Sequence, residues 1–295
     1  MAVTDYLRKR FMPHIWCPGC GHGIIMRALL SAVERLGLEK NDIVMASGIG
    51  CSARMLGYID VHTMHTLHGR ALAFATGVKM ARPDLTVVVP MGDGDALAIG
   101  GNHFIHAARR NIDMTAIVMN NSTYGMTGGQ YSPTTGCGEY GTTAPYGTVV
   151  EPFDTVELAT AAGASFVART TTYHAREMAR ILADAISHPG FSVVEVLTQC
   201  PTYYGRKNAK GDAVEMMERF RDCAVPVGPL DDEGRAPDAA AASAAADVDD
   251  ADAPEETIPI GVFRKEIRDE YCDAYRRRVI EPAAAASADA AGGDR

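Results

Sequence analysis

The stretch Leu85–Asp95 reads Leu-Thr-Val-Val-Val-Pro-Met-Gly-Asp-Gly-Asp, so a run of β-branched residues leads directly into a glycine-flanked carboxylate. The valines favour a buried strand that ends near Pro90. Glycines after the strand let the backbone approach phosphate oxygens closely, and the amides of a following helix can face the anion. Mg²⁺ commonly takes one carboxylate together with phosphates, and Asp93 can supply that carboxylate. The stretch therefore predicts a strand, a turn and a helix that can hold a magnesium–diphosphate group.

A second strand end completes the expected site. Asn121 follows the expected strand Thr115–Met119 and lies 28 residues after Asp93, the length of one strand–helix–strand crossover. Its amide oxygen and the backbone carbonyl of Thr123 can be the other protein ligands of the metal. Gly-Asp-Gly alone most often marks a turn, and two unrelated turns are the alternative. The pairing at this spacing favours a magnesium–diphosphate site that resembles the thiamine diphosphate motif.

The remaining periodicity predicts an α/β fold. Two further buried strands are expected at Asp42–Ser47 and Ser192–Leu197. Apolar residues at helical spacing run from Ile25 to Leu36, and Gly37 supplies a stop. Further helices are expected at Gly69–Ala81, Ala98–Arg110, Thr155–Ala162 and His174–Ser187. Alternating strands and helices imply a mostly parallel sheet with helices on both faces, whose ligands bind beyond the carboxyl ends of the strands.

Composition excludes several classes of protein. The chain has 295 residues, of which 47% are hydrophobic and 22% charged, as in ordinary globular proteins. No apolar run approaches the roughly 20 residues that a membrane span needs. The first residues lack the layout of a signal peptide, so we expect a cytoplasmic location. Seven cysteines in such a chain indicate metal binding or free thiols rather than disulfides. Binding to nucleic acid would need an excess of basic residues, which this chain does not have.

Charge and composition also divide the chain. Residues 231–256 hold ten acidic side chains and one arginine, which accounts for the whole net charge of −9. We expect a folded body at residues 1–228 that binds the cofactors, followed by an acidic Ala/Asp-rich linker at 229–257. The linker has too few apolar side chains to offset its ordering entropy, so disorder is expected, with an alanine-rich helix as the alternative. For 258–295 we expect a short helix over Ile258–Ile280 and a loose tail.

Four cysteines have the setting of a metal or cluster site. Cys17 and Cys20 form a Cys-x-x-Cys knuckle, Cys51 lies in a Gly-rich loop after a strand, and Cys200 directly precedes Pro201. Four thiolates suit a [4Fe–4S] cluster, and a cysteine followed by proline is common at such sites. A structural zinc site is the alternative, although zinc knuckles usually come as two local pairs. The other cysteines, Cys137, Cys223 and Cys272, are interpreted as ordinary thiols.

With these residues assembled, the chain resembles the β subunits of 2-oxoacid:ferredoxin oxidoreductases, and most closely those of the 2-oxoglutarate enzymes. The resemblance covers residues 14–210 nearly continuously. Its marks are Trp16–His22, Ser47–Ser52, His65–Arg70, Met91–Asp95, Gly101–Arg110, Asn120–Gln130 and Cys200–Tyr203. The acidic segment and the C-terminal tail lie outside it. The fold that it implies is the thiamine-diphosphate-binding fold.

The resemblance also implies site residues. Cys17, Cys20, Cys51 and Cys200 would ligate one [4Fe–4S] cluster close to the thiazolium ring. Asp93, Asn121 and the Thr123 carbonyl would hold Mg²⁺. Gly94, Asp95, Gly125 and Met126 would line the diphosphate, and Ile49, Gly50, Cys51, Ser52 and His68 would contact the cofactor. For Met126 a hydrophobic wedge beneath the cofactor ring is expected, or simple filling of a gap in the core. For His68 a structural role at a helix start is equally open.

The activity implied is the oxidative decarboxylation of a 2-oxoacid with coenzyme A, giving acyl-CoA and CO₂ and passing electrons through the cluster to ferredoxin. No glutamate in a recognisable motif is available to activate thiamine, and in the family another subunit supplies it. We therefore expect the chain to be inactive without an α subunit, with γ and ferredoxin-like δ subunits as further partners. Pyruvate or a branched-chain 2-oxoacid is an alternative substrate, and a non-redox thiamine lyase or a zinc scaffold is an alternative class.

Arg54, three residues after Cys51, is a candidate for substrate recognition. A planar guanidinium binds carboxylates in a bidentate manner, and 2-oxoglutarate carries two of them. We hypothesise that Arg54 binds a substrate carboxylate; the alternative is an ordinary surface arginine.

Overall fold

A single twisted sheet organises the protein. The computed structural model describes residues 1–237 and 257–284. Eight strands pair in the order β2-β1-β3-β4-β8-β7-β10-β9, and every neighbouring pair is parallel except β10 with β7. The strands are β1 Ile43–Ser47, β2 His62–His65, β3 Thr86–Gly92, β4 Met114–Asn120, β7 Phe166–Thr171, β8 Phe191–Leu197, β9 Ala224–Pro226 and β10 Ile258–Lys265. The mostly parallel α/β sheet predicted from the sequence is confirmed.

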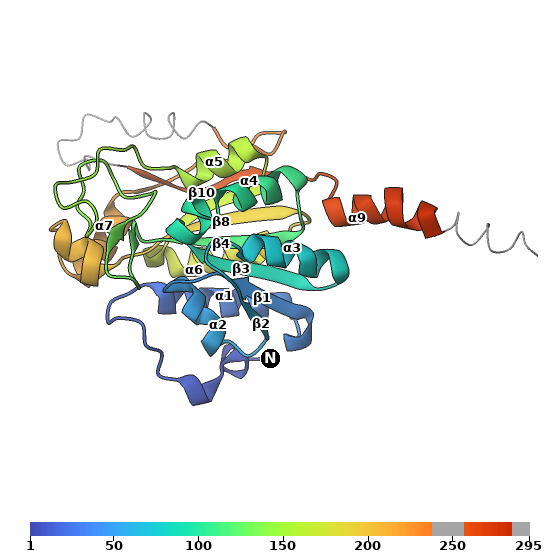
Figure 1. Cartoon of the computed structure of the whole chain (residues 1–295), viewed down its shortest axis with the longest axis horizontal. Helices are drawn as coiled ribbons and strands as arrows, with labels where there is room; N and C mark the ends of the chain where they lie inside the picture. The colour runs from blue at the N-terminus through green and yellow to red at the C-terminus, as the bar shows by residue number, and fades with distance from the viewer. Residues whose placement is uncertain (238–256, 285–295) are drawn as a thin grey trace, which may run out of the picture.

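Helices cover both faces of the sheet, and each face has its own apolar core. The helices on one face are α1 His22–Leu36, α2 Met55–Tyr58 and α6 Ala175–Ser187. Those on the other are α3 Ala71–Ala81, α4 Gly101–Arg110 and α5 Thr155–Ala162. Figure 1 shows the sheet between these two groups. Because a parallel sheet buries both faces, β1 and β4 are buried along their whole lengths.

The predicted elements agree closely with those observed. The four expected strands correspond to β1, β3, β4 and β8, and the five expected helices to α1, α3, α4, α5 and α6. Gly37 ends α1 in the left-handed conformation, with φ of 65°, and its N–H bonds the carbonyl of Glu34. The strands β2 and β7 were not predicted. β2 is an edge strand with a polar sequence and no buried residue, and β7 carries Arg169 in its centre.

The C-terminal region differs from the expected helix. Ile258–Lys265 is strand β10 of the main sheet, and helical structure begins only at α9 Tyr271–Tyr275 and continues in Arg276–Ile280. Pro259 and Gly261 disfavour a helix, and Gly261 has φ of 133°, where a side chain would be strained. The expected single helix over Ile258–Ile280 is therefore wrong for its first part. The helices α9 and Arg276–Ile280 project away from the sheet (Figure 1).

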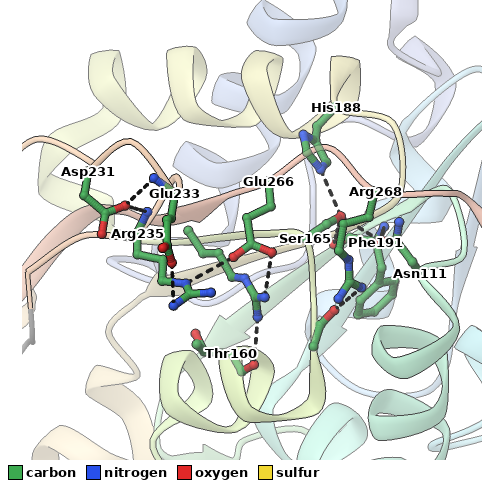
Figure 2. Close-up of polar contacts among 12 residues, drawn as sticks. Asn111, Thr160, Ser165, His188, Phe191, Asp231, Glu233, Arg235, Glu266 and Arg268 are labelled. Carbon is green, nitrogen blue, oxygen red and sulfur yellow. Dashed lines mark hydrogen bonds and ion pairs between the residues drawn. The ribbon is translucent and has the colours of Figure 1, made fainter.

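The first residues of the expected linker are packed against β10. Asp231 accepts hydrogen bonds from the backbone N–H groups of Glu233 and Arg235, and Arg235 pairs with Glu266 at 3.3 Å (Figure 2). The backbone of Gly234 accepts a hydrogen bond from Lys265 at 2.7 Å. This part of the acidic segment is thus ordered by polar contacts, which composition did not reveal. Residues 238–256, on which most of the disorder prediction falls, lie outside the described residues.

A second polar cluster in Figure 2 fixes the amino ends of the strands. Ser165 donates to Asn111 at 2.6 Å, and its hydroxyl lies 2.9 Å from His188 Nε2. Arg268 donates to the backbone carbonyl of Gly163 at 2.6 Å, which joins the segment after β10 to the start of β7.

None of the helices in residues 1–237 and 257–284 combines the length and the apolar character that a membrane span needs.

Candidate cofactor site

A cavity of about 250 Å³ opens at the carboxyl ends of β1, β3 and β4. Its lining comes from three loops, Ile49–Ser52 after β1, Gly92–Asp95 after β3 and Thr123–Thr127 after β4, together with His22, His68, Met119 and Asn121. Every residue predicted to contact thiamine diphosphate or Mg²⁺ lies in this lining. This is the place where ligands bind in open parallel sheets, because the loops there are free to vary while the strands hold them.

Asp93 lines the cavity from the loop after β3. Its side chain is buried, and its Oδ2 accepts hydrogen bonds from the Ser132 hydroxyl at 2.5 Å and from the Thr134 hydroxyl at 2.7 Å. Burial raises the pKa of Asp93 to about 6, although the two hydroxyls oppose the shift. A buried carboxylate without a cation is unfavourable, and a divalent ion would remove the penalty. The donor set therefore fits Mg²⁺.

Asn121 and Thr123 line the same cavity as the loop after β3. The Asn121 Oδ1 accepts a hydrogen bond from the Thr123 backbone at 3.3 Å, around Ser122 in the left-handed conformation. The Thr123 hydroxyl then bonds the carbonyl of Gln130 at 3.0 Å, which ties β5 Thr123–Tyr124 to β6 Gln130–Tyr131. The turn thus holds an amide and a backbone carbonyl at the edge of the cavity, both of which are oxygen donors that suit Mg²⁺.

Asp95 joins the loops around the cavity. Its Oδ1 accepts a hydrogen bond from the Gly69 backbone at 2.6 Å and lies 2.8 Å from His68 Nδ1. A Cβ added at Gly48 would lie only 2.2 Å from this Oδ1, so the position demands glycine. Within the described part of the chain, Asp95 Oδ2 is buried without a hydrogen-bond partner. Burial raises the pKa of Asp95 as well. The unpartnered oxygen is a polar group that a bound ligand can satisfy.

Two glycines allow the β3 and β5 loops to approach closely. A Cβ at Gly94 would lie 2.1 Å from the Tyr124 ring. A Cβ at Gly125 would lie 3.3 Å from the Cys51 sulfur and 3.8 Å from the Cys200 sulfur. Gly125, which lines the cavity, therefore lies next to two of the four candidate cluster thiols. Met126, which is 43% exposed, lies at the rim rather than in a core gap.

The four cysteines predicted to act together come from three separate parts of the chain. Burial raises the pKa of Cys20 to about 12, and the charges of Cys51, Cys200 and Cys17 raise it further. Burial raises the pKa of Cys51 to about 11, with Cys200 and Cys17 again contributing. Neutral thiols are thus favoured unless a positive group binds them, and iron would supply that charge. Cys17 is the exposed member of the group.

In residues 1–237 and 257–284, no group of three or more His, Cys, Asp or Glu side chains is arranged to hold one metal ion. A Cys₄ zinc site needs four sulfurs each about 2.3 Å from a single ion. In a four-iron cluster each thiolate binds its own iron, so the sulfurs surround a larger volume. The ligation of a cluster by these four cysteines stays a prediction.

Arg54 is not part of the cavity lining as described. Its side chain is exposed. Its positive charge partly opposes the rise that burial causes in the pKa of Cys51. Its role in binding a substrate carboxylate therefore stays a prediction, and the side chain would have to meet the substrate from outside the present lining.

Sequence reasoning missed the polar residues behind the site. The glutamate at position 195 is buried, and its carboxylate pairs with Arg169 at 2.5 Å and accepts a hydrogen bond from Asn120 at 2.9 Å. Thr134 contacts both Asn120, at 2.9 Å, and Asp93, so a continuous chain of polar contacts leads from the β7–β8 strands to the candidate metal ligand. No local motif marks Thr134 in the sequence. The only possible signal was the rarity of buried Arg and Glu in strands.

This polar chain also borders a second, larger cavity of about 550 Å³ beyond the Asn120–Ser122 turn. Arg169, which bridges Glu195 and Asp154, forms part of its wall. Asn121 lines both cavities.

Comparison with known proteins agrees with this geometry. Residues 46–196 match the family model described as the thiamine pyrophosphate enzyme C-terminal TPP-binding domain. The matched region begins in β1 and ends in β8, and thus includes the loops after β1, β3 and β4 that line the cavity.

Several relatives are similar over most of their length. The chain is 49% identical to the 2-oxoglutarate synthase subunit KorB of Archaeoglobus fulgidus, over 93% of each chain. It is 54% identical to the subunit of the same name from Methanothermobacter thermautotrophicus, over 74% of this chain and 76% of the relative. Among solved structures, it is similar to the 2-oxoglutarate:ferredoxin oxidoreductase from Magnetococcus marinus with 2-oxoglutarate, coenzyme A and succinyl-CoA bound. That match has a TM-score of 0.81 and 36% identity, and it covers 95% of this chain and 91% of the other.

Proposed function

The chain belongs to the family of 2-oxoacid:ferredoxin oxidoreductase β subunits that includes the 2-oxoglutarate synthase subunits, and from that membership we propose how its own residues serve the reaction. The protein is an oxidoreductase subunit that binds thiamine diphosphate. Its substrate is proposed to be 2-oxoglutarate, which is converted with coenzyme A into succinyl-CoA and CO₂ while ferredoxin is reduced. The observation that carries the proposal is the position of Gly125, which lines the cofactor cavity and lies next to the sulfurs of Cys51 and Cys200.

For the diphosphate end, we propose that Asp93, Asn121 and the Thr123 carbonyl hold Mg²⁺. The hydroxyls of Ser132 and Thr134 engage one oxygen of Asp93, so that the other oxygen is available to the ion. Gly94 lets the loop lie against the Tyr124 ring, where a side chain would block the approach. Bound thiamine diphosphate supplies an electron sink for decarboxylation, and these residues hold it in one orientation.

For the redox end, we propose that Cys17, Cys20, Cys51 and Cys200 hold a [4Fe–4S] cluster. Such a cluster accepts electrons one at a time. The protein fixes the position of the cluster, because Cys51 lines the cofactor cavity and Cys17 is exposed to solvent. We propose that an external electron carrier, ferredoxin in this family, is served from the Cys17 side.

Completion of the active site requires a partner. Among the described residues that line the cavity, the carboxylates are those of Asp93 and Asp95, and there is no glutamate that could activate the cofactor. The cavity lining includes exposed apolar side chains, with Ile49 exposed by 45% and Met126 by 43%. Exposed apolar patches commonly mark protein interfaces. We propose that an α subunit covers these side chains and supplies the activating glutamate, and that γ and δ subunits complete the assembly.

The proposal is tested on the complex that this chain forms with its partner subunits, purified without oxygen. We expect stoichiometric thiamine diphosphate, four irons and four acid-labile sulfides per chain, and coenzyme A-dependent reduction of a low-potential acceptor with 2-oxoglutarate. Turnover of pyruvate or a branched 2-oxoacid in its place would contradict the substrate assignment. A complex that decarboxylates but contains no iron would instead be a non-redox thiamine lyase.

A further inference from the structure

The imidazole of His22 lies beside one of the proposed cluster thiols. Its Nδ1 is 3.0 Å from the Cys20 sulfur, and the side chain is almost fully buried, with 1% exposure. His22 also lines the cofactor cavity. The side chain therefore borders both the thiol group and the cofactor site, and the function proposed above does not use it.

The surroundings fix this imidazole. His22 is the first residue of α1, and the backbone of the preceding Gly21 is held against the loop after β8, where an added Cβ would lie 2.3 Å from the Thr198 hydroxyl. The Trp16 ring packs against the imidazole at 5.7 Å between centroids. The same indole donates from Nε1 to the Cys51 carbonyl at 2.7 Å. One aromatic side chain thus orients both the imidazole and the backbone of a second cysteine.

A neutral imidazole carries one N–H, and a thiolate sulfur can only accept. Once Cys20 binds a cluster as a thiolate, its contact with the imidazole requires the tautomer that carries the proton on Nδ1, which then donates to the sulfur. A sulfur ligand of a cluster becomes more negative when the cluster is reduced, so a donor to it stabilises the reduced form more than the oxidised form.

We propose that His22 is a positioning residue that raises the reduction potential of the cluster by donating a hydrogen bond from Nδ1 to the Cys20 sulfur. This inference rests on the proposed function, because it requires the cluster. A donor of this kind makes the cluster a better acceptor for electrons that leave the adjacent cofactor cavity. It acts through Cys20 and needs no contact with substrate.

The test compares variants of the holoenzyme by redox titration of the cluster, followed by electron paramagnetic resonance. His22→Phe keeps a ring of similar size but removes the donor. We expect its one-electron reduction equilibrium to shift about tenfold toward the oxidised cluster, which corresponds to a midpoint potential about 59 mV more negative. His22→Asn places an amide N–H near the same position and is expected to restore the potential toward that of the wild type.

His14→Phe is the matched control. His14 packs against the same Trp16, at 5.0 Å between ring centroids, and within the described residues it makes no hydrogen bond to a cysteine sulfur. Its variant is expected to keep the wild-type potential. An unchanged potential in His22→Phe, or an equal shift in His14→Phe, would overturn the role of the hydrogen bond.

A second measurement does not depend on the stability of a variant. Wild-type holoenzyme labelled with ¹⁵N-histidine should show a magnetic coupling between the reduced cluster and a histidine nitrogen in pulsed electron paramagnetic resonance. Its absence from an intact cluster would refute the inference about His22 and leave the proposed function standing. Absence of any cluster from the wild-type complex would refute both.

Discussion

Replacement of Asp93 by asparagine should stabilise the chain when Mg²⁺ and cofactor have been removed, and should abolish the binding of both. Burial raises the pKa of Asp93 from 3.8 to about 6. The folded chain therefore keeps this proton when the unfolded chain has already lost it. Between about pH 4 and pH 6 the stability falls as pH rises, and above pH 6 the cost of the buried charge is fully present.

The size of the effect follows from the shift. Two pKa units at 1.36 kcal/mol each give about 3 kcal/mol at pH 8. Asparagine carries no charge, so Asp93→Asn escapes this cost, and the hydroxyls of Ser132 and Thr134 can turn to accept from its amide. We expect the variant to be more stable than the wild type by up to about 3 kcal/mol at pH 8, with the advantage vanishing near pH 4.

The assay is urea unfolding of the metal-free and cofactor-free chain at several pH values, for the wild type and for Asp93→Asn. The difference between the two proteins isolates this carboxylate, because other titrating groups contribute equally to both. Binding of thiamine diphosphate with Mg²⁺, measured by calorimetry at pH 8, should be lost in the variant. If the variant gains no stability at pH 8, or gains the same amount at pH 4, the account of Asp93 as a buried and unpaired charge is refuted.

Three further changes test the site. Thr134→Val removes a hydroxyl donor from Asp93 and should weaken Mg²⁺-dependent cofactor binding in calorimetry by roughly 10-fold, since partners of metal ligands typically contribute 10–100-fold. Thr134→Ser keeps the hydroxyl and should bind the cofactor normally. Equal affinities of the wild type and both variants would contradict this role of Thr134. Gly94→Ala places a methyl group 2.1 Å from the Tyr124 ring and should prevent cofactor binding in the same assay, and unchanged affinity would show that the loops adapt. Arg54→Met should raise KM for 2-oxoglutarate far more than for an uncharged 2-oxoacid, whereas equal losses in steady-state kinetics would refute the carboxylate assignment.

The fold and the cofactor loops could be predicted because their signals are local. A run of valines before Gly92 indicates a buried strand independently of the surrounding sequence. The glycines of the Met91–Asp95 stretch indicate that the backbone there can approach phosphate oxygens closely. Asp93 and Asn121 follow neighbouring strands, so they were expected at one edge of the sheet, and both line the same cavity. The topology of a parallel sheet brings Asp93 and Asn121 together although they are far apart in the sequence.

The missed features depend on partners that are distant in sequence. Thr134 reaches Asp93 across 41 positions, and nothing near either residue indicates the pairing. Strand β10 was mistaken for a helix because its place in the sheet is set by pairing with β7, about 95 residues earlier. The order of residues 231–237 rests on contacts such as Arg235 with Glu266, which a low apolar content does not exclude.

Reduction of the cluster by substrate is the most direct test of the central claim, which is that thiols around the thiamine cavity hold a cluster that collects electrons there. The holoenzyme with its partner subunits is mixed with 2-oxoglutarate and coenzyme A in the absence of an external acceptor, and the reduced [4Fe–4S] signal is followed by electron paramagnetic resonance. We expect the signal to appear as CO₂ is released. Release of CO₂ with a cluster that stays oxidised would contradict the account.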